Sequence, residues 1–113
     1  MYSYMAILSG VDIVYIPKIE KILNNDNNLL KKFFHGSELT NRKPEHLAGI
    51  IAAKEAFFKA LGMVPRFQDV ELAYEGSGKP KLIVASEFQY FKSCDISISH
   101  DQDYAIALVI LER

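Results

Sequence analysis

The chain has 113 residues, a length that suits one compact domain over residues 1–113 rather than two. Half of the residues are apolar, a quarter or so are charged and the net charge is −1, a balance that argues against a membrane protein and against a nucleic-acid binder. The single cysteine, Cys94, cannot form a disulfide within the chain, which is typical of a protein in the reducing cytoplasm.

Hydrophobic periodicity and turn residues predict a mixed order of helices and strands. The expected elements are a strand at 5–16, short helices at 17–23 and 28–34, a long helix at 45–61, strands at 69–74 and 81–84 around a glycine-rich turn at 75–79, a short helix at 86–91, and strands at 95–99 and 104–111 around a tight turn at 101–103. The first strand is apolar on both faces, so we expect it to be mostly buried. This order, which ends in an antiparallel hairpin, predicts an α+β fold.

Asp12 places a carboxylate in the first predicted strand, among apolar neighbours on both faces. A buried carboxylate is costly unless it is paired, hydrogen-bonded or bound to a metal. Two interpretations stay open from the residue alone. Asp12 is either a structural residue, which caps the helix at Pro17 or pairs with a lysine, or a functional ligand.

The long predicted helix carries an apolar stripe and, beside it, a line of small residues that would let another backbone approach closely. Glu55 and Lys59 continue that line, four residues apart and therefore on one face. They form either an exposed ion pair of little energetic weight or part of a site. Lys54 falls in line with the apolar stripe, so we expect its charge to reach the surface or to find a partner.

Alternation along the strand at 95–99 puts His100 on the core side of the strand, at its end and just before a turn. Such a histidine is either structural, with its hydrogen bonds satisfied, or catalytic. His35 and His46 lie in polar surroundings, and we interpret both as surface residues. The turn at 75–79 lacks the Walker spacing and a following helix, so its glycines indicate a hairpin turn rather than a phosphate-binding loop.

The order of several short motifs is more informative than any one of them. They are Gly10-Val11-Asp12, Ala52-Ala53-Lys54-Glu55-Ala56-Phe57, Lys59-Ala60-Leu61-Gly62, Gly78-Lys79-Pro80, and Ile96-Ser97-Ile98-Ser99-His100 with Asp103-Tyr104-Ala105. In this order and spacing the chain resembles the holo-acyl-carrier-protein synthase family, the small class of phosphopantetheinyl transferases, over nearly its whole length. The resemblance implies an antiparallel sheet packed around a long central helix.

The resemblance also implies an activity, the transfer of the 4'-phosphopantetheine arm of coenzyme A to a serine of an apo-acyl carrier protein, with release of adenosine 3',5'-bisphosphate. Asp12 and Glu55 would hold Mg²⁺, which prefers carboxylate and phosphate oxygens. Lys59 would lie beside the coenzyme A phosphates and His100 near the nucleotide. The Gly78-Lys79-Pro80 turn would line the coenzyme A site. The base that takes the serine proton stays open between Glu55 and a water on the ion.

Members of this small class form trimers with active sites between subunits, so the resemblance implies a homotrimer. The last predicted strand is apolar on both faces and needs cover on both, from a neighbouring subunit or from the long helix. Lysines gather on the two short helices after Asp12, at 18, 21, 31 and 32. They are either a docking face for an acidic carrier protein or a solvated helix surface.

The chain departs from the family pattern at four places that concern substrate contacts more than metal ligands. Tyr15 stands where a glutamate is usual, Lys18 where an arginine is common, Ile50 replaces an arginine, and 63–66 replaces a glycine-rich loop. A catalytically degenerate module that binds coenzyme A or a carrier protein therefore stays open as an alternative. The presence of Asp12, Glu55, Lys59 and His100 together favours the enzyme. The sequence names neither the carrier nor the tolerated acyl-coenzyme A donors.

Overall fold

The structure, a computed structural model, describes residues 6–25 and 27–113. Its elements are β1 (Ile7–Tyr15), α1 (Ile16–Asn25), α2 (Asn27–Phe33), α3 (Pro44–Leu61), β2 (Val70–Tyr74), β3 (Pro80–Val84), β4 (Ser93–Asp101) and β5 (Tyr104–Glu112), with short 3-10 helices at Gly36–Thr40, Phe67–Asp69 and Ser86–Phe88. The predicted α+β class is confirmed, and the long helix is found at the predicted place. Met5 of the predicted first strand and Asp26 of the predicted loop lie outside the described residues.

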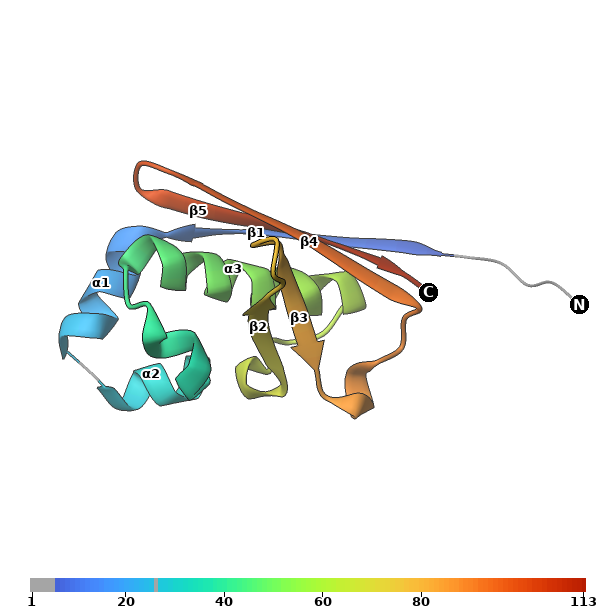
Figure 1. The fold of residues 1–113 in the computed structure, drawn as a ribbon, viewed down its shortest axis with the longest axis horizontal. Coiled ribbons are helices and arrows are strands. Elements are labelled where there is room, and N and C mark those ends of the chain that lie inside the picture. Colours follow the sequence, from blue (N-terminus) through green and yellow to red (C-terminus); the bar gives the residue numbers. More distant parts are fainter. Residues whose placement is uncertain (1–5, 26) are drawn as a thin grey trace, which may run out of the picture.

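The strands form two antiparallel sheets. One has the order β1-β5-β4 and the other is the β2-β3 hairpin. Figure 1 shows α3 running along one face of the three-stranded sheet, the β2-β3 hairpin crossing α3, and α1 and α2 at one end of the molecule. The helix and the strands share one hydrophobic core, in which α3 contributes apolar residues around most of its circumference.

The ends of α3 follow local rules. Pro44 occupies the first helical turn, where its missing N–H leaves no hydrogen bond unmade. Gly62 closes the helix in the left-handed conformation, with φ of 71°. No helix among residues 6–25 and 27–113 is long and apolar enough to cross a membrane.

β1 packs closely on α3 at Gly10. A Cβ atom built on Gly10 would lie 1.9 Å from the carbonyl oxygen of Ala56 and 2.9 Å from the backbone nitrogen of Ala60. Only glycine allows two backbones to approach in this way. The close approach is therefore present, but at Ala56 and Ala60 rather than along the predicted line of small residues. It brings Asp12, two residues along β1, against the same helix.

The expectation that β1 would be mostly buried is wrong for one of its faces. Alternate residues Ile7, Val11 and Ile13 are 62%, 52% and 60% exposed, whereas Gly10 and Asp12 are buried on the side of α3. β5 alternates in the same way, with Ala107 buried and Leu108 43% exposed. A single α3 can cover only one face of the sheet, so the other face remains an apolar outer surface.

Candidate active site

Two carboxyl groups meet between β1 and α3. Asp12 pairs with Ala107 across the sheet and lies on the buried side toward the helix, where its carboxyl group acts electrostatically on that of Glu55. Burial, and next the neighbouring Asp12, raises the pKa of Glu55 to about 7. The second oxygen of Asp12, Oδ2, is buried and has no hydrogen-bond partner among the described residues. A buried acceptor of this kind is costly unless a ligand or ion satisfies it.

Lys59 contributes positive charge to this pair. Its Nζ lies 2.9 Å from Asp12 Oδ1 and donates a second hydrogen bond, of 3.2 Å, to the Val11 carbonyl oxygen. The bond to Asp12 raises the pKa of the lysine. Lys59 therefore pairs across to β1, and of the two structural roles considered for Asp12, the pairing with a lysine is the one present. Asp12, Glu55 and Lys59 form one cluster, called here the carboxylate cluster.

The carboxylate cluster has the chemistry of a magnesium site. Carboxylate oxygens are the preferred ligands of this ion, and the unpartnered oxygen of Asp12 supplies an acceptor with no other use. The described residues contain no group of three or more His, Cys, Asp and Glu side chains that could hold a metal. An ion here would take its other ligands from water, backbone or substrate, as Mg²⁺ commonly does at phosphate sites.

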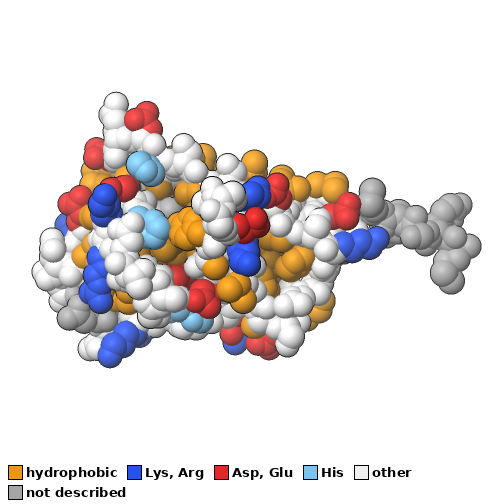
Figure 2. All heavy atoms as spheres, in the orientation of Figure 1, with side chains coloured by type: hydrophobic (Ala, Val, Ile, Leu, Met, Phe, Trp, Pro, Cys, Tyr) orange, Lys and Arg blue, Asp and Glu red, His pale blue; other side chains and the backbone are white. Residues whose placement is uncertain are grey.

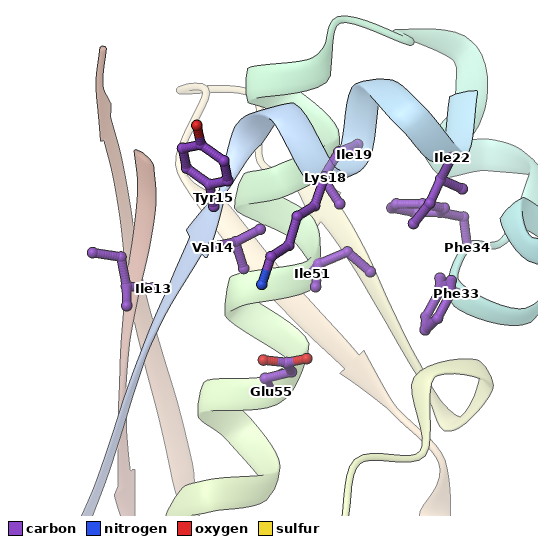
Figure 3. A pocket seen from close by; sticks show the side chains of 10 residues that line it. All are labelled: Ile13, Val14, Tyr15, Lys18, Ile19, Ile22, Phe33, Phe34, Ile51 and Glu55. Carbon is purple, nitrogen blue, oxygen red and sulfur yellow. The ribbon is translucent and has the colours of Figure 1, made fainter. Parts of the chain in front are cut away.

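An apolar cavity of about 230 Å³ adjoins Glu55 between the end of β1, α1, α2 and α3. Its walls include Ile51, Ile19 and the aromatic rings of Phe33 and Phe34. Figure 3 shows Lys18 extending from α1 along this cavity toward Glu55. Lys18 acts electrostatically to lower the pKa of Glu55, although burial and Asp12 outweigh this effect. Tyr15, one of the departures from the family pattern, also lines the cavity.

A second cavity, of about 400 Å³, lies at the other edge of the sheet and contains other predicted site residues. Gly78, Pro80 and His100 line it, and so does His46, which we interpreted as a surface residue. His46 is half-buried and stacks on Tyr74 with 5.8 Å between ring centroids; burial lowers the pKa of this histidine. Sequence reasoning missed both rings, because their contact joins α3 to β2. We call this the histidine cavity.

Two predicted residues lie differently from expectation at this edge. His100 follows the alternation of β4 on the side of α3, but it is exposed because the strand ends there, beyond the core that buries Ile96. The Lys79 side chain points away from the histidine cavity and forms an ion pair with Asp95 at 2.7 Å.

The structure therefore does not unite all the predicted site residues within one chain. Asp12 is on β1 and His100 on β4, and β5 separates these two edge strands. Two strand spacings amount to roughly 10 Å, and α3 fills the space beneath them. The carboxylate cluster and the histidine cavity therefore lie apart, on opposite edges of the sheet.

Lys54 has found a partner in the core rather than reaching the surface. Its Nζ is fully buried and bonds to Glu38 Oε1 at 2.7 Å and to the carbonyl oxygens of Phe33 and Phe67. Glu38 in turn accepts hydrogen bonds from the backbone N–H groups of His35 and Leu72. Glu38 lies in a 3-10 helix that the sequence patterns missed. His35 is also half-buried, and its Nε2 lies 2.9 Å from the Gln68 carbonyl oxygen.

Comparisons with known proteins give the family of the chain. The family model of the 4'-phosphopantetheinyl transferase superfamily matches residues 9–109. The chain is 40% identical to a holo-[acyl-carrier-protein] synthase of Nautilia profundicola, over 90% of this chain and 96% of that protein.

Solved structures show the same likeness. The structure of Helicobacter pylori holo-[acyl-carrier-protein] synthase in complex with coenzyme A superposes with a TM-score of 0.85 at 32% identity, covering 92% of this chain and 99% of that one. The structure of the Bacillus anthracis holo-(acyl-carrier-protein) synthase in complex with CoA (3',5'-ADP) superposes with a TM-score of 0.79 at 33% identity. The match covers 96% of this chain and 98% of that one. With a match along nearly all of its length, the chain belongs to the 4'-phosphopantetheinyl transferase superfamily.

Proposed function

We propose that the protein is a cytoplasmic holo-[acyl-carrier-protein] synthase, which transfers the 4'-phosphopantetheine arm of coenzyme A to a serine of an apo-acyl carrier protein. The observation that carries the proposal is the carboxylate cluster, where a buried Asp12 oxygen without a partner lies beside Glu55 and Lys59. Relatives named holo-[acyl-carrier-protein] synthase, and similar structures with bound coenzyme A, supply the substrates that such a cation and phosphate site would take.

In the proposed reaction the serine hydroxyl of the carrier loses its proton, to Glu55 or to a water, and its oxygen forms a bond to the β-phosphorus of coenzyme A. The pyrophosphate P–O bond breaks, and its electron pair leaves with adenosine 3',5'-bisphosphate. Transfers of this type depend mainly on positioning and on electrostatic stabilisation of the phosphoryl oxygens. Asp12 and Glu55 would hold Mg²⁺, which when bound offsets the charge that develops on the pyrophosphate. Lys59 would add a point charge beside the same phosphates.

We assign the nucleotide end of coenzyme A to the histidine cavity. It offers the backbone of Gly78 and Pro80, the rings of His46 and Tyr74, and the exposed imidazole of His100. Because this cavity and the carboxylate cluster lie on opposite edges of the sheet, we assign the two half-sites of each active site to different subunits. The second oxygen of Asp12 then faces a site that a neighbouring copy completes.

The assembly that we propose is a homotrimer. The outer face of the three-stranded sheet exposes a row of apolar side chains, and a patch of this kind marks an interface. Its exposed members include Ile7, Val11, Ile13, Tyr15, Tyr104, Ile106 and Leu108. Contact between two different edges of the same chain is a head-to-tail contact, which closes into a ring when the rotation permits. Three copies would create three sites, each with one carboxylate cluster and one histidine cavity.

The activity is tested by the mass of an apo-acyl carrier protein after incubation with the protein, coenzyme A and Mg²⁺. We expect a gain of one phosphopantetheine with the wild type and none with Asp12→Ala or Glu55→Ala. If coenzyme A binds in calorimetry and the carrier mass never changes, the chain is a degenerate binding module and the transferase proposal fails. If Asp12→Ala still transfers at a near-normal rate at limiting Mg²⁺, Asp12 is not a ligand of the ion.

Sharing of sites is tested by mixing two variants that damage different half-sites. Asp12→Ala and His100→Ala should each be nearly inactive alone. Random co-assembly of equal amounts should restore about a quarter of the total wild-type activity, because on average one site in four combines two intact halves. Separately assembled variants, mixed without subunit exchange, provide the control. Absence of recovery after proven co-assembly would place both half-sites in one subunit.

A further inference from the structure

The ion pair between Lys59 and Asp12 uses the carboxylate that the proposed function assigns to Mg²⁺. Lys59 Nζ is 2.9 Å from Asp12 Oδ1, and the Val11 carbonyl oxygen accepts its second hydrogen bond. Glu55 lies on α3 close enough for Asp12 to act electrostatically on its carboxyl group, so two carboxyl groups meet at one place. Without another ion, the ammonium group of Lys59 contacts Asp12, and Lys59 and Lys18 both act electrostatically on Glu55.

The two partners of this ion pair differ in how firmly they are held. The Asp12 side chain is 10% exposed and fixed on a strand, whereas the Lys59 side chain is 57% exposed. A lysine ammonium on a flexible stem is readily hydrated, and exposed ion pairs contribute little to stability. Lys59 can therefore move away from Asp12 when another cation takes its place, whereas Asp12 is fixed on β1.

We propose that Lys59 is an exchangeable counter-ion, which neutralises Asp12 in the metal-free protein and releases it when a divalent cation binds. The released ammonium group then turns to the phosphates of coenzyme A, one helical turn from Glu55. The inference rests on the proposed function, because it takes Asp12 and Glu55 as ligands of the ion. It differs from a fixed phosphate contact in one respect: Lys59 competes with the metal as long as coenzyme A is absent.

Competition between Lys59 and the metal for Asp12 has an unusual consequence for metal affinity. Removing the lysine charge should strengthen metal binding to the free protein, even though it weakens coenzyme A binding. It should also reduce the coupling between the two ligands, because phosphates that draw Lys59 away from Asp12 favour the metal, and such coupling is reciprocal. A lysine that only contacts phosphate would leave the affinity for the metal alone unchanged.

The test is a titration with Mn²⁺ as the probe, followed by electron paramagnetic resonance of the free ion, without coenzyme A and at 0.15 M salt. Lys59→Met should bind Mn²⁺ about three- to tenfold more tightly than the wild type, since it loses both a competing partner and a nearby positive charge. Lys79→Met is the matched control, because it also breaks an exposed lysine–aspartate pair, at Asp95. It should leave the affinity unchanged.

Equal or weaker binding by Lys59→Met overturns the exchange and leaves the metal site itself intact. If wild type and Lys59→Met both bind Mn²⁺ no better than Asp12→Asn does, the metal assignment of the proposed function fails, and the exchange fails with it. Lys59→Gln, which keeps a hydrogen-bond donor without the charge, should behave as Lys59→Met does. A wild-type affinity for Lys59→Gln would show that charge is not the cause.

A second measurement tests whether the Lys59 ammonium group moves to the coenzyme A phosphates. The factor by which coenzyme A tightens Mn²⁺ binding should be smaller in Lys59→Met than in the wild type. Thermal unfolding in Mg²⁺ alone gives a readout that needs neither substrate nor activity, and the ion should raise the melting temperature of Lys59→Met by more than that of the wild type. An unchanged coupling factor would overturn the movement of Lys59 to coenzyme A.

Discussion

Helix α3 carries two lysine–carboxylate pairs that differ in almost every physical respect. Lys54 and Glu38 are buried at 0% and 3% exposure, and the three hydrogen bonds of the ammonium group all end on protein oxygens. Lys59 is exposed, and its partner Asp12 keeps a buried oxygen without a hydrogen bond. We call the first the closed pair and the second the open pair.

The difference distinguishes a structural ion pair from a candidate site on one helix. Every polar atom of the closed pair that the protein could satisfy has a partner, and the pair ties α3 to the 3-10 helix at Gly36–Thr40 and to β2. The open pair joins two elements and leaves one acceptor for a ligand. A buried polar network completed inside the chain indicates a structural role, whereas one left incomplete beside a cavity indicates a site.

The largest effect is expected at the closed pair. Lys54→Met leaves the Glu38 carboxylate buried without its cation, which should lower the free energy of unfolding by about 3–5 kcal/mol. The midpoint of urea unfolding measures this change. Adding Glu38→Gln to Lys54→Met removes the stranded charge and should regain part of the loss. A single variant within about 1 kcal/mol of the wild type would show that the pair is not closed to water.

The next effect concerns the backbone contact that holds the open pair together. Gly10→Ala forces a Cβ against the Ala56 carbonyl oxygen, a backbone atom that cannot move cheaply, so it should cost about 3 kcal/mol. It should also separate Asp12 from Glu55 and so weaken Mn²⁺ binding in whatever fraction remains folded. Gly76→Ala is the control, because its Cβ would meet no atom within 4 Å. Equal stability of the two variants would contradict the close packing of β1 on α3.

Local sequence patterns could predict that the residues of the open pair lie close together, but they could not predict the closed pair. Alternation along β1 and the period of α3 place Asp12, Glu55 and Lys59 on facing surfaces, and Pro44 and Gly62 fix the bounds of the helix. These are local rules. For Lys54, its position in the apolar stripe of α3 indicated only that its charge must reach the surface or find a partner.

Long-range pairing explains what the sequence could not reveal. Glu38 lies in a short 3-10 helix without periodicity, 16 residues from Lys54. The strand order β1-β5-β4 puts Asp12 and His100 on opposite edges, a fact that no local pattern contains. The apolar outer faces of β1 and β5 were visible in the sequence, but alternation does not say whether a helix or another subunit covers them.

A moderate effect is expected on α1, at lysines that adjoin the open pair. Basic side chains lie along the end of the molecule where α1 and α2 are found (Figure 2). Lys18 extends toward Glu55, and Lys21 is exposed on the same helix. If acidic carrier proteins dock there, Lys18→Glu with Lys21→Glu should raise the KM for the carrier roughly tenfold and flatten its salt dependence.

The KM for coenzyme A separates docking from other roles of these lysines. It should stay near the wild-type value in the double variant. Lys92→Glu is the control, because Lys92 is also exposed but lies far from α1 in the sequence, and it should change neither the KM for the carrier nor that for coenzyme A. A parallel rise of both constants would assign Lys18 and Lys21 to the coenzyme A site or to the fold.

The smallest effect completes the comparison on α3. Lys59→Met, measured without divalent ions, should lower the free energy of unfolding by about 1–2 kcal/mol, less than Lys54→Met does, because Lys59 itself is exposed even though Asp12 is buried. Most of that small loss should vanish at 1 M salt, where screening already weakens the wild-type pair. Lys79→Met, at a pair whose two partners are both exposed, should change the free energy of unfolding by less. If Lys59→Met instead destabilises the protein as much as Lys54→Met does, the open pair is a structural element, and the unpartnered oxygen of Asp12 needs another explanation.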